Sequence, residues 1–437
     1  MTIKRTFCAS RVFRGISFVT ILFTLIFLVG TFSSCRRKDI FSKEVYKGIT
    51  HGVYPVDTLD EFNTWSLLKN MMVRVTADIP IDDLEKVEIL SANPYGLSSE
   101  ILAEEQISFG ETKWLAFDLP NTQEAFCAAL VTKGGKYYVK EFPVSDTDLS
   151  FSSGGVINSG TFYKPSYQTY TYLFEQSFPN PTDFDYNDVV LRISKQAMSE
   201  SVLNITVTLA AASAPESMAG LIRLPDIPYD MVENVKIIEG TPMDYEYPMT
   251  RFKLNTNKTL TKGRDGKAVI ALFECAHWSL SHETMKMGNI AYIKYNTTHY
   301  ENEGEALHKP IQTRTYEITV KEGLDVRYLP LSDIDPFLIT TYNSVYFEIH
   351  TYPYKFDEVI WEYIGKDKRA YDDHLAWALL IPDATFRYPI EEMPLGTFRN
   401  GELFGAYGKY NHSFGQWCRN HETSIDWWQN AASAMVY

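Results

Sequence analysis

Short segments in which apolar and polar residues alternate recur along most of this chain of 437 residues. Leu203 to Leu209 (LNITVTL) is the clearest example, and Lys86 to Ser91 (KVEILS) has the same period of two. That period places every second side chain on one face, which is typical of half-buried β-strands. Other segments have strand composition as well, at 71–77, 114–120, 125–132, 137–140, 169–174, 189–193, 219–225, 234–238, 267–272, 316–320, 346–352 and 375–382. The sequence therefore predicts a mainly β protein.

Turn signals and composition divide these strands into two groups. About six short strands within 61–150, with a two-glycine hairpin turn at Gly134-Gly135, predict a small N-terminal β-sandwich. A stretch rich in Ser, Gly and Asp over 145–160 separates it from a larger β-rich domain over 160–437. Only 401–420 and 422–434 have helical patterns, so we expect that domain to end in a short helical C-terminus.

The N-terminus has the pattern of a lipoprotein signal peptide over 1–34. The first 15 residues contain four basic residues and no acidic residue. An apolar run from Ile16 to Phe32 follows, and Ser33-Ser34 then precede Cys35. Small residues before a cysteine at this place resemble a bacterial lipobox, so we expect Cys35 to be lipidated and 35–60 to be a tether. An uncleaved signal anchor is the alternative, because the run is nearly long enough to span a bilayer.

Either interpretation places the chain at the cell envelope, facing away from the cytoplasm. We predict a lipid anchor in the outer membrane. Because the basic triplet Arg36-Arg37-Lys38 follows the cysteine, the sequence does not determine whether the protein is on the periplasmic or the surface face. Without 1–34 the formal net charge falls from −14 to about −18, since that segment holds four basic residues and no acidic one. Such a charge argues against nucleic acid as a partner.

The cysteines do not form a metal or redox motif. No CxxC spacing occurs, and Cys127, Cys275 and Cys418 are widely separated. An odd number outside the signal makes a disulfide framework a poor interpretation, so we expect buried free thiols.

Oxygen-bearing side chains concentrate between two predicted strands. Asp183, Asp185, Asn187 and Asp188 follow the turn Pro179-Asn180-Pro181, and their carboxylates repel one another unless a cation or strong hydrogen bonds separate them. Oxygen ligands at alternate positions suit Ca²⁺ rather than Zn²⁺. The spacing is not that of an EF-hand, so the turn needs outside ligands, and Glu175 is the first candidate. Asx-turns that cap backbone amides are the alternative interpretation.

Catalytic motifs are absent from the sequence: it contains no HExxH, GxSxG, GxxxxGK[ST] or GxGxxG. His277 and His282 are five residues apart, a spacing that does not place both on one helical face, and we interpret them as polar loop residues. Asp372-Asp373-His374 is interpreted as a solvated turn, and His350 as a sheet histidine. Trp427-Trp428 could stack on a sugar, but core packing is the favoured interpretation.

Several segments in order carry a family resemblance. They are Phe174-Glu175, Pro179, Asp183 to Asp188 with Val190, Gly220 to Pro225, Glu348 to His350, Ala376 to Glu391, and Ala406 to Trp428. Together they resemble the LruC-type domain of bacterial lipoproteins, especially of Bacteroidetes, over about residues 170–430. Gln176 and the Asn180-Pro181-Thr182 turn depart from the family pattern, with one carboxylate fewer beside the acidic stretch. The resemblance implies a β-rich fold and an envelope location. No enzyme activity follows from it.

The predicted function is that of a membrane-anchored binding or structural module stabilised by calcium. The predicted ligands are Glu175, Asp183, Asp185, Asn187 and Asp188, and the expected partners are the membrane and either a glycan or an envelope protein. The alternative is a glycan-active or glycan-binding protein with an acidic site near Glu175 and Asp185. A glycoside hydrolase would need two carboxylates facing each other across an open cleft.

Overall fold

The structure is a computed structural model that describes Tyr54, 56–176, 183–214, 218–240, 259–281, 294–297, 309–342, 345–352, Tyr354 and 375–437. The predicted signal peptide and Cys35 lie outside these residues. Among the described residues, no helix is long and apolar enough to cross a membrane. Ile49–Tyr437 forms one compact unit, within which the predicted boundaries at 60, 150 and 160 stay predictions.

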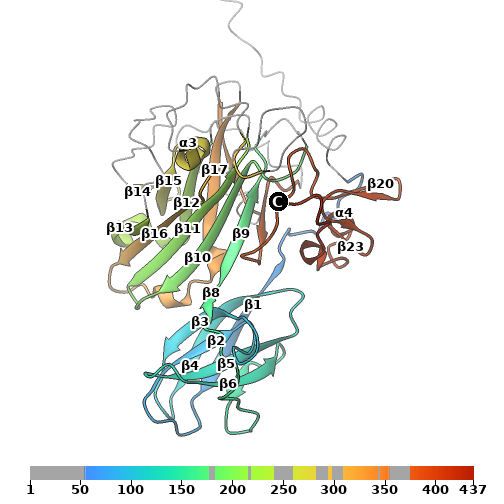
Figure 1. Ribbon diagram of the computed structural model, residues 1–437. Coiled ribbons are helices and arrows are strands. Elements are labelled where there is room, and N and C mark those ends of the chain that lie inside the picture. The colour runs from blue at the N-terminus through green and yellow to red at the C-terminus, as the bar shows by residue number, and fades with distance from the viewer. Residues whose placement is uncertain are drawn as a thin grey trace, which may run out of the picture. The chain divides into compact units, whose positions relative to one another are not determined.

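The N-terminal strands form two sheets, coloured blue to cyan in Figure 1. The first has the order β4-β1-β7 and the second the order β6-β5-β2-β3-β8. Their bounds are β1 Leu68–Thr76, β2 Leu84–Leu90, β3 Glu100–Gln106, β4 Thr112–Pro120, β5 Ala125–Thr132, β6 Tyr137–Pro143, β7 Asp148–Ser150 and β8 Ser166–Tyr167. A shared core joins both sheets, as a sandwich requires.

Strand β5 shows why one of these segments lacks alternation in its sequence. Its even-numbered residues Phe126 and Ala128 belong to the core shared with β1 and β4. Its odd-numbered residues Cys127 and Ala129 pack on the opposite face with Tyr137. Both faces of the strand are covered, so an unbroken apolar run is the physical expectation.

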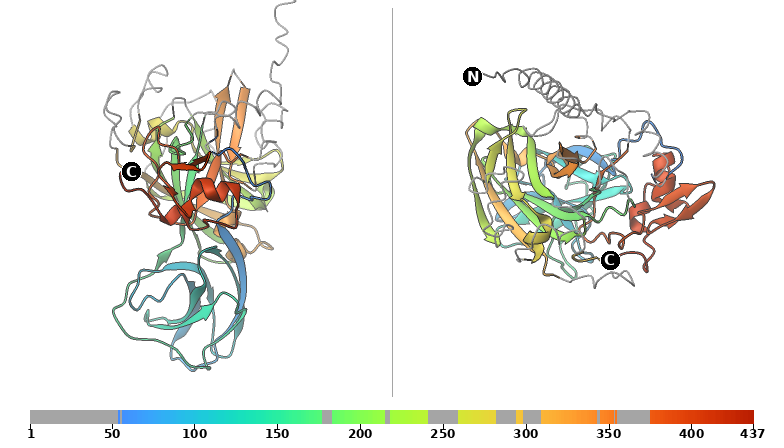
Figure 2. Two further views of the ribbon diagram at one scale, coloured as in Figure 1. Left: turned by 90° about the vertical axis from the view of Figure 1, so that its right-hand side faces the viewer. Right: turned by 90° about the horizontal axis from the view of Figure 1, so that it is seen from above.

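The C-terminal strands form two larger sheets, of orders β13-β16-β11-β10-β9-β19 and β14-β15-β12-β17-β18. Figures 1 and 2 show most of these strands in green to orange, and β19 falls in the red part of the colour bar. The first sheet has β9 Thr169–Phe174, β10 Val189–Ala197, β11 Val202–Ala212, β13 Val232–Gly240, β16 Gln312–Val320 and β19 Ala378–Ile381. The second has β12 Ala219–Pro228, β14 Leu260–Lys262, β15 Lys267–Phe273, β17 Asp335–Tyr342 and β18 Val345–His350. The mainly β prediction is confirmed.

The helical C-terminus is shorter than the sequence pattern indicated. The hairpin β20 Thr397–Arg399 with β21 Glu402–Phe404 precedes β22 Gly408–Lys409 and β23 His412–Ser413. Helix α4 covers only Phe414–Arg419, and a 3₁₀ turn, η7, covers Trp427–Gln429. Asn400 and Gly401 have φ of 52° and 82°, the left-handed backbone of a two-residue hairpin turn, which a helix cannot contain.

The residues just before β1 are packed rather than extended into solvent. Tyr54, Val56, Trp65 and Leu67 are each at most 4% exposed. Val56 pairs in parallel with Phe398 of β20. The last residues of the predicted tether therefore contact the C-terminal segment, shown in red in Figure 1.

Candidate metal centre

The acidic turn lies between two paired strands of the six-stranded sheet. Phe174 at the end of β9 pairs with Val189 at the start of β10, and Phe174 also forms a parallel bridge with Asn187. This register brings Glu175, which follows β9, beside the acidic residues that precede β10. The β10–β11 pairing shifts between Val190 and Leu191, so the ladder is irregular right after the turn.

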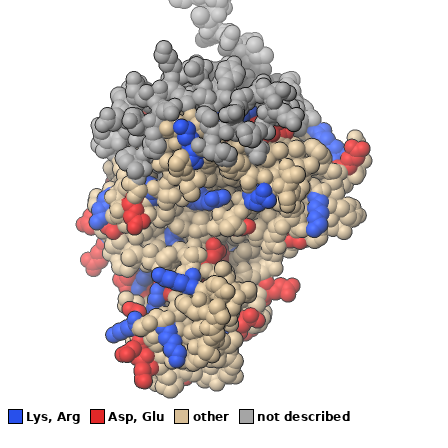
Figure 3. Space-filling model, in the orientation of Figure 1, with Lys and Arg blue, Asp and Glu red and all other residues tan. Residues whose placement is uncertain are grey.

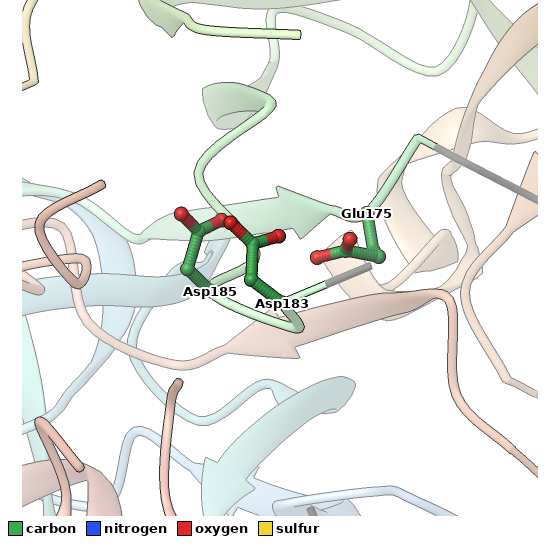
Figure 4. Close-up of side chains that lie close together, drawn as sticks. All are labelled: Glu175, Asp183 and Asp185. Atoms are coloured by element: carbon green, nitrogen blue, oxygen red, sulfur yellow. The ribbon is translucent and has the colours of Figure 1, made fainter. Parts of the chain in front are cut away.

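Three of the five predicted ligands converge. One carboxylate oxygen each from Glu175, Asp183 and Asp185 lies within 4.8 Å of the other two. Figure 4 shows the three side chains pointing toward one another, from the end of β9 and from the turn. Glu175 and Asp185 are buried and Asp183 is half-buried. Three carboxylates at this spacing offer oxygen ligands to a hard cation.

Hydrogen bonds hold the Asp185 carboxylate in place. Its Oδ1 accepts from the amide nitrogen of Asn187 at 3.2 Å, which is the Asx-turn of the alternative interpretation. Its Oδ2 accepts from Asn187 Nδ2 at 3.0 Å and from the amide nitrogen of Glu392 at 2.9 Å. Backbone capping and a shared carboxylate cluster thus coexist in this turn.

Asp188 is not part of the converging carboxylate group, and the side chain of Asn187 is engaged in hydrogen bonds. Asn187 donates from Nδ2 to the carbonyl oxygen of Pro389 at 3.1 Å and accepts a hydrogen bond from Ser213 Oγ. Asp188 Oδ2 accepts from the amide nitrogen of Gln176 at 2.6 Å. Both side chains connect the turn to neighbouring segments.

The cluster is electrostatically unfavourable without a cation. Burial raises the pKa of Asp185 well above its usual range, and the nearby Asp183 and Glu175 carboxylates raise it further. Burial and the charge of Asp183 also raise the pKa of Asp188, whereas the hydrogen bond from the Gln176 amide lowers it. A bound divalent cation would reverse these effects, because it favours the ionised form of each carboxylate.

Glu391 is a fourth carboxylate that the sequence did not nominate. Its side chain is 9% exposed, and its charge contributes to the raised pKa of both Asp185 and Asp188. One of its oxygens pairs with Lys294, whereas Oε2 is buried without a hydrogen-bond partner among the described residues. Glu391 ends one of the segments that carry the family resemblance, but no local pattern places it beside the turn, because some 200 residues separate the two.

The aromatic residues of the turn have strained backbones. Phe184 and Tyr186 have φ of 53° and 56° and are fully buried. The Tyr186 amide donates to Glu175 Oε2 at 3.2 Å, and its hydroxyl donates to the carbonyl oxygen of Ala376 at 2.7 Å. Left-handed backbone is uncommon for bulky residues and occurs where packing compensates for it.

The other sequence candidates are buried or lie outside the described residues. His277 is fully buried in helix α3 (Ala276–Ser281) rather than in a polar loop, while His282 and 371–374 are not described. Trp427 is 0% and Trp428 8% exposed, and Trp427 packs on Tyr407, Phe414 and Trp417, which confirms core packing over a sugar platform. Cys127 and Cys418 are buried free thiols, as expected.

Three of the acidic residues that the structure describes at the turn are enclosed, and Asp183 is half-buried. Glu175, Asp185 and Asp188 are 0%, 2% and 7% exposed. On the face drawn in Figure 3, acidic and basic side chains are interspersed. Enclosed carboxylates favour a structural or cation-binding role over the glycan-cleaving alternative.

Comparisons with known proteins give a family and a fold. Residues 201–428 match the family described as "Domain of unknown function (DUF4842)". A solved structure, described as a candidate lipoprotein from Bacteroides ovatus, aligns with 82% of this chain and 99% of its own at 17% identity, with a TM-score of 0.50. That likeness shows a shared fold. No curated protein matches. The resemblance to LruC-type domains stays a prediction.

Proposed function

This chain belongs to the DUF4842 family, and we propose that it is a lipid-anchored protein of the cell envelope whose acidic turn binds Ca²⁺. Its role is to bind or to support other envelope components rather than to catalyse a reaction. The observation that carries the cation site is the convergence of Glu175, Asp183 and Asp185. A lipoprotein description of the Bacteroides ovatus structure supports the anchor, together with the basic, apolar and Cys35 pattern of the N-terminus.

The donor chemistry favours Ca²⁺ among common cations. The converging side chains offer only oxygen, which Zn²⁺ and other softer metals do not prefer. Ca²⁺ takes six to eight oxygens in flexible geometry, so carboxylates that bind through two oxygens each can supply most of its ligands. Glu391 Oε2, buried beside the cluster, is a further donor within this proposal.

A thermal unfolding experiment tests the site. The full-length protein in detergent is unfolded in excess chelator and in excess CaCl₂, alongside Asp183→Asn. Ligand at about a hundred times its Kd stabilises by about 3 kcal/mol, which moves the midpoint by roughly 5 °C or more. We expect the wild-type protein to show this shift and Asp183→Asn to lose most of it.

The order of thermal stability of the wild type and Asp183→Asn should also differ between CaCl₂ and chelator. In chelator, Asp183→Asn should be at least as stable as the wild type, because it removes one of several repelling charges. The matched control is Asp82→Asn, an exposed aspartate of the N-terminal sandwich, which should respond to Ca²⁺ like the wild type. Equal wild-type midpoints in chelator and CaCl₂ would refute the calcium site.

The anchor is tested by membrane fractionation. Cys35→Ser should leave the protein unacylated, as intact mass spectrometry would show. An acyl mass retained in this variant would rule out Cys35 as the acylated residue, whereas a wild-type protein that keeps residues 1–34 and carries no acyl mass would favour the uncleaved signal anchor.

A further inference from the structure

The acidic turn presents two different faces. Asp183 and Asp185 point to the candidate metal centre, whereas Phe184 and Tyr186, at the positions between and after them, pack elsewhere. Both side chains contact Tyr54, Phe184 through its ring and Tyr186 through its hydroxyl. The ring centroids of Tyr54 and Phe184 are 4.7 Å apart, and the hydroxyl oxygens of Tyr54 and Tyr186 are 3.3 Å apart. The turn therefore connects the carboxylate cluster to the N-terminal segment.

That segment, Tyr54 and residues 56–67, is called here the N-terminal strap. Beyond Tyr54 it lies along the C-terminal segment. The Asp60 amide donates to the carbonyl oxygen of Cys418 at 2.9 Å, and the His421 amide donates to Asp60 Oδ2 at 3.0 Å. Trp65 packs edge-on against Trp417 at 5.6 Å. The strap is seated at one end on the acidic turn and along its length on residues 398–421.

The contacts of Tyr54 with Phe184 and Tyr186 depend on the backbone conformation of the turn. Phe184 and Tyr186 hold positive φ, an arrangement that costs roughly 1 kcal/mol or more at each residue unless the surroundings impose it. A cation bound by Asp183 and Asp185 would fix the chain on both sides of Phe184. Mutual repulsion of the same carboxylates, without the cation, acts against that arrangement.

We propose that cation binding at the acidic turn locks the N-terminal strap, and that cation loss releases it. This inference rests on the proposed calcium site. The strap directly follows the segment that would lead from the lipid anchor, so its release lengthens the connection to the membrane. Up to 14 residues, Tyr54 to Leu67, would extend the reach by about 45 Å.

Coupling of this kind is reciprocal. If Ca²⁺ strengthens the seating of the strap by some factor, a seated strap strengthens Ca²⁺ binding by the same factor. Removal of Tyr54 must then weaken Ca²⁺ binding, although Tyr54 is not among the carboxylate ligands. A purely structural role for Tyr54 would not require this.

Hydrogen exchange measured by mass spectrometry tests the proposal. The full-length protein in detergent is compared in CaCl₂ and in chelator, and the reporters are peptides that contain the Asp60 and Asn63 amides, which are hydrogen-bonded in the seated strap. We expect exchange at least tenfold faster in chelator. Peptides from β5, which belongs to the core of the N-terminal sheets, serve as the internal reference and should not change.

Three variants sharpen the test. Tyr54→Ala should exchange fast in both conditions, and its Kd for Ca²⁺ by calorimetry should rise by the factor by which Ca²⁺ slows exchange in the wild type. Tyr54→Phe keeps the ring contact with Phe184 but loses the hydroxyl contact with Tyr186, so it should change both quantities less than Tyr54→Ala does. Tyr410→Ala, a substitution of a tyrosine that is 70% exposed on the C-terminal segment, is the matched control and should change neither quantity.

The outcomes separate this proposal from the one on which it rests. Absence of any Ca²⁺ binding heat in the wild type would overturn both. Ca²⁺ binding with unchanged strap exchange would overturn the lock and leave the calcium site intact. Faster exchange in chelator together with a weakened Kd in Tyr54→Ala supports the lock.

Discussion

Nε2 of His350 lies 3.0 Å from Oε2 of Glu348, two residues earlier on strand β18. The other ring nitrogen, Nδ1, lies 3.0 Å from Oδ2 of Asp335 on the neighbouring strand β17. A neutral imidazole has only one N–H, so two carboxylate partners require the doubly protonated ring. His350 is therefore a buried cation in the second large sheet. Nε of Arg223, on strand β12, lies 3.4 Å from Oδ2 of Asp335 and adds a second positive charge beside that carboxylate.

This arrangement predicts a loss of stability in mild alkali. Burial opposes protonation of His350, but the charges and hydrogen bonds of Asp335 and Glu348 outweigh it and raise the pKa of His350 to about 9. A raised pKa in the folded state stabilises fully below the unfolded value near 6.5, and that contribution is lost as the pH rises through about 9. The whole effect is on the order of 3 kcal/mol.

The check is urea unfolding of the wild type and His350→Gln from pH 6 to pH 10. The difference between them should be largest at pH 6 and shrink toward pH 10. His412→Gln replaces a half-exposed histidine that also pairs with a carboxylate, Asp426, and is the matched control. A pH-independent difference for His350→Gln would contradict the charged state.

Lys294 carries a positive charge close to the acidic turn. It pairs with Glu391, and its charge also favours the ionised form of Asp188. We expect Lys294→Met to bind Ca²⁺ about three- to tenfold more tightly, because a positive charge near the site is removed and Glu391 is released from its ion pair. Calorimetry with CaCl₂ measures this change, with the exposed Lys164→Met as control. Weaker binding in Lys294→Met would show that the lysine supports the site instead.

Gly405 holds the C-terminal segment in its compact form. Its φ is +111°, and a Cβ there would lie 2.5 Å from the carbonyl oxygen of Pro394. We expect Gly405→Ala to cost about 2–4 kcal/mol of unfolding free energy, since backbone strain and a backbone clash add. Gly401 also has a positive φ, +82°, but a Cβ there would meet no atom within 4 Å. Gly401→Ala should therefore lower the unfolding free energy by only about 1 kcal/mol. Equal costs for both variants in urea unfolding would exclude the clash as a cause.

Much of the strand content was predictable because strand composition and alternation are local properties. Strands β5 and β9 begin and end at the predicted residues, and β11 extends the predicted 203–209 by one residue before and three after. The C-terminal segment was harder. Asn400-Gly401 is a strong hairpin signal, yet the Trp-containing pattern around it also has helical spacing. Local preference was ambiguous there, and in the structure the hairpin pairs with the strap through Val56 and Phe398.

The sequence by itself determined the β class, the acidic turn and the return of Glu175 toward it, because periodicity, turn residues and charge repulsion act over a few residues. Only the tertiary structure decided which oxygens meet. It placed Asn187 and Asp188 in backbone and side-chain hydrogen bonds, brought Glu391 and Lys294 to the cluster, and seated Tyr54 on the turn. The contacts from Asn187 to Pro389 and from Tyr54 to Phe184 join residues more than a hundred positions apart. Their positions follow from sheet register and packing, which no local pattern encodes.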